Sequence, residues 1–269
     1  MRSWHYIIKY AAIALAILLI IGVFSILMHV LSYFIPFFSS NTTGEMKTYE
    51  VGSDITVLDI DIHQVDLEVM TALDSNFKVE SNYNYLSVLE KDNELHIQDK
   101  RGFHFNIRGN AVLKLYVPYG KVLEKADINT GTGTTDLENL QTKVIKLELG
   151  AGKAVLEKIS VVDHAFVDAG AGKVVIKDSQ FKNLDLDMGV GNFEFSGLLL
   201  GKNVLKQGVG SSQIDLVGSL DDYTIHVEKG LGSVRVGKEN VKDNTQLGQG
   251  DRVISFKGGV GSVKIDFTE

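Results

Sequence analysis

The chain lacks cysteine entirely and has little proline or tryptophan: its 269 residues include no Cys, two Pro and one Trp. The missing thiols exclude disulfides, Cys-ligated zinc and thiol catalysis together. Acidic residues are missing from the first 38 positions, where Arg2 and Lys9 are the only Lys or Arg. The net charge of −7 therefore becomes −9 over residues 39–269, with 25 Lys or Arg against 34 Asp or Glu. So acidic a segment has no electrostatic footprint for nucleic acid, and we expect no nucleic-acid partner.

The first 38 residues instead contain a long apolar run, almost uninterrupted from Tyr10 to Phe38. About 20 such residues span the hydrocarbon core of a bilayer, roughly 30 Å thick. Aromatic residues flank both ends of the run, and its cations precede it, which places the N-terminus in the cytoplasm. We therefore predict a cytoplasmic tip and transmembrane helical anchor (1–38, contacting lipid through 10–38), a linker (39–45) and an extracytoplasmic domain (46–269).

A cleaved signal peptide is the competing interpretation of this segment. Its apolar region would be shorter, and a site with small residues would follow it. Here the run ends in the bulky sequence Tyr33–Phe38, which is unsuited to cleavage. We therefore favour an uncleaved anchor in the cell membrane.

Glycine is present in excess, with 27 residues, and much of it recurs in a fixed pattern. Apart from Gly248–Gly250, a Gly-x-Gly triplet occurs seven times, at intervals of 19, 20, 19, 19, 22 and 29 residues. We predict that the fourteen glycines are structural corner residues: Gly131, Gly133, Gly150, Gly152, Gly170, Gly172, Gly189, Gly191, Gly208, Gly210, Gly230, Gly232, Gly259 and Gly261.

Apolar residues alternate with polar ones on both sides of each triplet, as in half-buried strands. The third residue before the first Gly and the fourth after the second Gly are always apolar, for example Leu147 and Leu156. The parity of the buried positions switches across the triplet, so a straight strand would turn its apolar face to solvent. A glycine corner removes that conflict.

One unit of about 19–20 residues cannot bury its own apolar face, but stacked units can. We therefore predict an all-β, solenoid-like (β-helix-like) stack of about ten coils, preceded by one transmembrane α-helix. Residues 46–125 show the same alternation without the triplets and are richer in aromatics, which is typical of a capping end. The last strand, Ser262–Glu269, would leave an uncovered rung. Such a rung is a template for pairing, so we expect end-to-end self-association or strand addition by a partner through it.

Several residue patterns could indicate a chemical site. A dinucleotide fingerprint would need a third Gly, a following helix and a downstream acid, none of which accompanies these seven triplets. The seven His residues show no metal-ligand spacing. Alternating acids such as Asp59/Asp61, Asp66/Glu68 and Asp185/Asp187 could align as a calcium ladder or a glycosidase pair. Lys and Arg interrupt the same columns, so we favour a solvated, partly ion-paired face. We predict no catalytic residues, no cofactor and no metal site.

The sequence Tyr116–Gly120, then Leu123–Ile128, then repeated strand, Gly-x-Gly and strand, resembles the bacterial β-strand-repeat family labelled "putative adhesin" (domain of unknown function 4097). The resemblance covers residues 46–269. The family usually shows one Gly followed by Asp, whereas this chain has Gly-x-Gly followed by Lys, Asn or Ser. It implies a β-solenoid-like domain, frequently membrane-tethered, and in some relatives an association with cell-envelope stress systems such as the Lia system of Gram-positive bacteria. It supplies no catalytic residues.

These observations predict a non-enzymatic interaction or scaffold module of the bacterial envelope, in stress sensing or adhesion, with an envelope protein or polysaccharide as partner. A carbohydrate-active β-helix enzyme is one alternative, but it would need carboxylates converging with Arg or aromatics. A cell-surface adhesin is another. About ten coils at ~4.8 Å each project only about 50 Å, which favours the wall-proximal zone.

Overall fold

The computed structural model describes most of the chain after the predicted anchor. Of the anchor itself only Gly22, Ser25 and Ile26 are described, all helical, so the predicted span lies outside the described residues. Among the residues that are described, no helix is long and apolar enough to cross a membrane. The described ranges are 42–72, 74–101 and 111–268.

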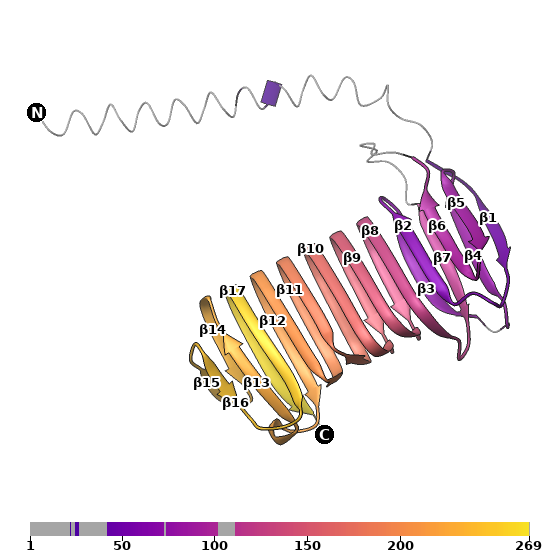
Figure 1. The fold of residues 1–269 in the computed structure, drawn as a ribbon. Helices are drawn as coiled ribbons and strands as arrows, with labels where there is room; N and C mark the ends of the chain where they lie inside the picture. The colour runs from indigo at the N-terminus through magenta and orange to yellow at the C-terminus, as the bar shows by residue number, and fades with distance from the viewer. Residues whose placement is uncertain (1–21, 23–24, 27–41, 73, 102–110, 269) are drawn as a thin grey trace, which may run out of the picture. The chain divides into compact units, whose positions relative to one another are not determined.

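Six long strands form the body of the fold, and each crosses from one face of the stack to the other at a glycine corner (Figure 1). Neighbouring long strands are parallel and in register, so that Gly152 lies opposite Gly133 on one side and Gly172 on the other. The strands are β8 (Val122–Glu138), β9 (Gln141–Glu157), β10 (Ser160–Lys182), β11 (Leu184–Leu200), β12 (Lys202–Val217) and β17 (Arg252–Thr268).

Burial alternates along each long strand and changes parity at the corner, which confirms the sequence prediction. In β9, Ile145 and Leu147 are buried before the corner, and Ala154 and Leu156 after it. All four contribute to one core between the two faces. Burying an aliphatic side chain of this size contributes about 1.5–3 kcal/mol. The core therefore stabilises the stack only when several coils share it.

The N-terminal end of the stack is completed by shorter strands. The coil beside β8 is built from β2 (Val57–Ile62) and β3 (Asp66–Ala72), and the next from β6 (Glu94–Asp99) and β7 (Val112–Pro118). Antiparallel strands then close the end: β4 (Phe77–Tyr83) on β7, β5 (Leu86–Lys91) on β6, and β1 (Thr43–Val51) on β4. Since β1 begins at Thr43, residues 43–45 of the predicted linker are strand.

The C-terminal end corrects one expectation about the last strand. After β12 the chain makes a short 3-10 helix, η2 (Leu220–Asp222), and then the end coil. This coil is β13 (Tyr223–Glu228) and β14 (Leu231–Val236), with β15 (Glu239–Val241) and β16 (Thr245–Leu247) paired antiparallel on its outer side.

The chain then returns, and β17 lies between β12 and the end coil, where Figure 1 shows it in yellow among orange strands. The prediction of an uncovered C-terminal rung is therefore wrong, because both edges of β17 are paired within the chain. Beyond it, the short β15 and β16 blunt the end of the stack.

Candidate interaction surface

The corner glycines predicted from the sequence lie in two columns along one edge of the stack. The second glycines are in register from coil to coil, for example Gly191 with Gly172 and Gly210. Each second glycine has a positive φ, between 130° and 158°, which residues with a side chain rarely adopt. The structure thus brings the predicted residues together as a structural element, in the role that the parity switch assigned to them.

Close packing requires glycine at these positions independently of φ. A Cβ on Gly191 would lie 1.8 Å from the carbonyl oxygen of Gly172, and one on Gly189 would lie 2.4 Å from that of Gly170. Real Cβ atoms essentially never approach another heavy atom within 3.0 Å. The corner edge is therefore made of backbone stacked on backbone, which leaves it little freedom to rearrange.

The middle residues of four triplets are large, apolar and exposed, and they form what we call the corner ridge: Val190, Val209, Val260 and Leu231. Cα pairing places these four residues side by side in that order. Their side chains are 47–77% exposed. Four coils at ~4.8 Å spacing make a ridge about 14 Å long. A continuous apolar strip on a rigid edge is a feature of surfaces that bind other molecules.

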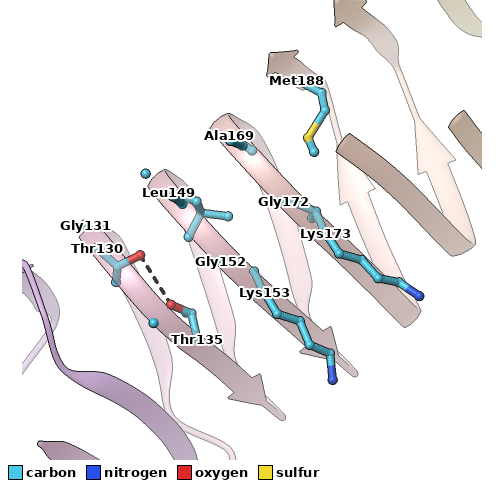
Figure 2. Close-up of a pocket in the computed structure, with 16 residues that line it drawn as sticks. Thr130, Gly131, Thr135, Leu149, Gly152, Lys153, Ala169, Gly172, Lys173 and Met188 are labelled. Carbon is cyan, nitrogen blue, oxygen red and sulfur yellow. Dashed lines mark hydrogen bonds between the residues drawn. The ribbon is translucent and has the colours of Figure 1, made fainter. Parts of the chain in front are cut away.

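Behind the corner, side chains from the two faces meet in the interior of each coil. Thr130 and Thr135 hydrogen-bond through their hydroxyls at 3.3 Å, as the dashed line in Figure 2 marks. Gln207 and Ser212 occupy the equivalent places in β12, where the Ser212 hydroxyl donates to Gln207 Oε1 at 2.5 Å. Both polar pairs are buried.

The hollow shown in Figure 2 lies at these corners. Its lining includes Thr130, Leu149, Ala169 and Met188 from four successive coils, and its volume is about 20 Å³. A volume of about 10–15 Å³ holds a single water molecule. The hollow therefore cannot accept a metabolite-sized ligand.

The outward faces of the strands carry paired charges, as the interrupted columns predicted. Lys114 contacts Glu68 at 3.0 Å, and Lys173 contacts Glu194 at 2.8 Å, both between neighbouring strands. Exposed pairs of this kind contribute only about 0–1 kcal/mol each. Within the described part of the chain, no group of His, Asp or Glu is arranged to hold a metal ion.

A buried cluster of side chains, which the sequence did not reveal, lies at the N-terminal end of the stack. At the end of β6, the buried Asp99 carboxylate accepts hydrogen bonds from the Tyr83 hydroxyl and the Arg101 backbone N–H, both at 2.8 Å. The Arg101 guanidinium lies 5.6 Å and 5.2 Å from the ring centres of Tyr83 and Tyr85. Burial, and then the hydrogen bond to Asp99, raise the pKa of Tyr83. The signal for this cluster that was available in the sequence was the acid and the arginine, together with the pair of tyrosines.

Comparison with known proteins bears on the whole repeat domain. Residues 55–267 match the family described as Toastrack DUF4097. A comparison with curated proteins found no match. Similar solved structures include a "putative cell adhesion protein" from Clostridium sporogenes, 17% identical, covering 83% of this chain and 99% of that chain with a TM-score of 0.37.

Two others are described as a "putative adhesin". That from Parabacteroides distasonis is 16% identical, covers 84% of this chain and 98% of that chain, and has a TM-score of 0.41. That from Bacteroides fragilis is 12% identical, covers 83% and 98%, and has a TM-score of 0.43. At these values the solved structures carry no inference about binding. The family match extends over most of the sequence, and the chain therefore belongs to the Toastrack family, domain of unknown function 4097.

Proposed function

We propose that the chain is a membrane-anchored, non-enzymatic interaction module of the bacterial cell envelope. Residues 10–38 hold it in the bilayer, and the repeat domain stands outside the cytoplasm. The observation that carries the proposal is the corner ridge, an exposed apolar strip on an edge whose backbone is fixed by stacked glycines. A preorganised surface loses little conformational entropy on binding, so even a small apolar area contributes to affinity.

The chemistry of the ridge favours a protein partner over a polysaccharide. Its four side chains are aliphatic and offer neither aromatic faces nor hydrogen-bond donors. An apolar groove on a protein is the surface they complement. In this setting the module would serve adhesion or the sensing of envelope stress, as in Lia-type systems.

The carbohydrate-active alternative has less support. The outward acids that would have to converge are engaged separately: Asp61 accepts from Asn129 at 3.1 Å, and Asp66 accepts from the Thr134 backbone N–H at 2.7 Å.

Site-specific photocrosslinking in native membranes tests the proposal. A photoreactive residue at Val209 of the full chain should capture one protein partner. Replacing Val190, Val260 and Leu231 with Ser should abolish that adduct. The matched control replaces Val162 and Val217 with Ser, because these exposed valines lie away from the triplets. Equal capture by the two sets, or capture of glycan alone, would contradict a protein-binding ridge.

The membrane topology has a separate test that uses the absence of cysteine. A single Cys at the exposed Lys153 should react with a membrane-impermeant maleimide in intact cells. A Cys at Arg2 should react only after the cells are opened. Labelling of Arg2→Cys in intact cells, with protection of Lys153→Cys, would reverse the proposed orientation.

A further inference from the structure

The order of the strands in the stack differs from their order in the sequence. β13 to β16 come before β17 in the chain, yet β17 lies between β12 and the end coil. The two longer triplet intervals, 22 and 29 residues, coincide with this detour. In the first interval the chain skips the position of one coil. The second interval contains β15 and β16.

β17 occupies a position one strand wide between β12 and the end coil, which we call the slot, and among the described strands the end coil pairs with the long strands through β17 alone. β12 pairs with β17 from Lys202–Val253 to Val217–Thr268, and the end coil pairs with its other edge. Strands on the two sides of the slot stand about 9.6 Å apart, twice the usual spacing. Without β17, both of these edges would present unpaired N–H and C=O groups, which is the arrangement that accepts an added strand.

The slot is selective for a strand like β17. A Cβ on Gly259 would lie 2.0 Å from the Gly208 carbonyl oxygen, so the incoming strand must carry glycine there. Phe256 and Ile265 of β17 are buried in the core. The buried Asn203 side chain donates to the Val253 carbonyl oxygen at 3.1 Å, which fixes the register.

The contacts between strand and slot are the same whichever chain supplies the strand. β17 is joined to β16 by residues 248–251, where Gly250 N–H donates to the Tyr223 carbonyl oxygen at 3.1 Å. That hinge and the protein concentration therefore decide between the closed monomer and exchange. We propose that the slot accepts β17 of a second copy, so that two chains folding near each other form a strand-exchanged dimer.

Exchange belongs to folding and not to the finished molecule. Removing β17 from a folded chain would break hydrogen bonds along both of its edges and expose Phe256 and Ile265. During synthesis, β17 is made after every other described strand, so the edges of β12 and of the end coil are made before the strand that joins them. Self-association through the C-terminal strand then proceeds by insertion, and the end-to-end stacking expected from the sequence is not required.

Engineered cysteines test the proposal, because the natural chain has none. Ser211 and Ser262 are exposed and are Cα partners on β12 and β17. Adjacent strands lie ~4.8 Å apart, within the Cα separation of about 4.4–6.8 Å that disulfides allow. Full-length Ser211→Cys and Ser262→Cys chains with different tags are unfolded together, refolded in detergent at low and high concentration, and then oxidised.

We expect a disulfide between the two tagged chains, linking positions 211 and 262 by peptide mapping and increasing several-fold with concentration. The control pair is Thr134→Cys with Ser262→Cys, because Thr134 occupies the same outward column on β8, away from the slot. The disulfide yield of this control pair measures random collision between chains. Chains refolded separately and mixed afterwards should show no more linkage than this control.

The double variant Ser211→Cys/Ser262→Cys guards against a failure to fold. Its disulfide within one chain at low concentration shows that both cysteines reach the native register. If this variant gives the intrachain link alone at every concentration, and the mixed single variants stay at the control level, β17 does not exchange and the proposal is wrong.

Discussion

The stacking of glycine on glycine predicts a severe effect from a single added methyl group. The test substitution is Gly191→Ala, in the middle of the long strands. Gly191 has a φ of 149°, a conformation that costs a residue with a side chain about 1–3 kcal/mol. Its new Cβ would also lie 1.8 Å from the Gly172 carbonyl oxygen. Two separate penalties therefore act at one position.

The second penalty follows from the spacing of the coils. To bring the Cβ to 3.0 Å from that oxygen, the neighbouring backbone must retreat by about 1.2 Å, which interiors packed as densely as crystals do not allow freely. Such a shift lengthens the hydrogen bonds beside the corner, each worth about 0.5–1.5 kcal/mol. Together with the φ penalty, we expect a loss of about 3–5 kcal/mol in the free energy of unfolding.

Gly237→Ala is the matched control. Gly237 also has a positive φ, 57°, but a Cβ there meets nothing within 4 Å. It should cost only the conformational penalty, about 1–2 kcal/mol. Urea unfolding of the full chain in a mild detergent, followed by circular dichroism, measures both variants. Equal losses in the two variants would show that the corner needs glycine for its φ alone, and the stacking argument would fail.

Three other substitutions test the buried polar groups and one acid. Ser212→Ala leaves buried Gln207 Oε1 without its donor and should lower the unfolding free energy by about 1–3 kcal/mol, whereas the double variant Gln207→Met/Ser212→Ala should recover most of that loss in the same urea assay. Asn203→Leu removes the hydrogen bonds that this side chain makes with Leu184 on β11 and Val253 on β17 and should lower the urea midpoint; an unchanged midpoint would refute its role in register. The Ser219 backbone N–H holds the pKa of Asp222 below its ordinary value. The contribution of Asp222 to stability is therefore complete above about pH 3.9 and is lost as pH falls through the lowered pKa. Asp222→Asn should show a smaller fall in urea midpoint over that acid range, and parallel curves would contradict the linkage.

Local patterns explain why the body of the fold was predictable. A period of two along each strand and a change of parity at each triplet are consequences of backbone geometry, so Leu147 and Leu156 could be assigned to the core by their offsets alone. The glycine positions followed from the same local requirement. Alternating charges such as Glu68 and Lys114 likewise indicated a solvated face, and the two are paired.

The candidate surface was only partly predictable. The sequence assigned the triplets to corners, but it did not show that their middle residues would align as an exposed ridge, because that depends on in-register stacking. Nor did it reveal that Asp99 accepts hydrogen bonds from the Tyr83 hydroxyl and the Arg101 backbone N–H. Those residues are distant in sequence and meet only when the antiparallel strands close the end of the stack.

The sequence by itself determined the strand period, the corner glycines, the acidic surface and the prediction of an N-terminal anchor. Only the tertiary structure decided which coil lies beside which. The six long strands and the end coil carry the same apolar columns and the same triplet, so their pairing preferences are nearly equivalent. The order of the coils then depends on the lengths of the connecting segments and on how the two ends of the stack are closed. Those constraints place β17, last in the sequence, inside the stack and leave β15 and β16 at its edge.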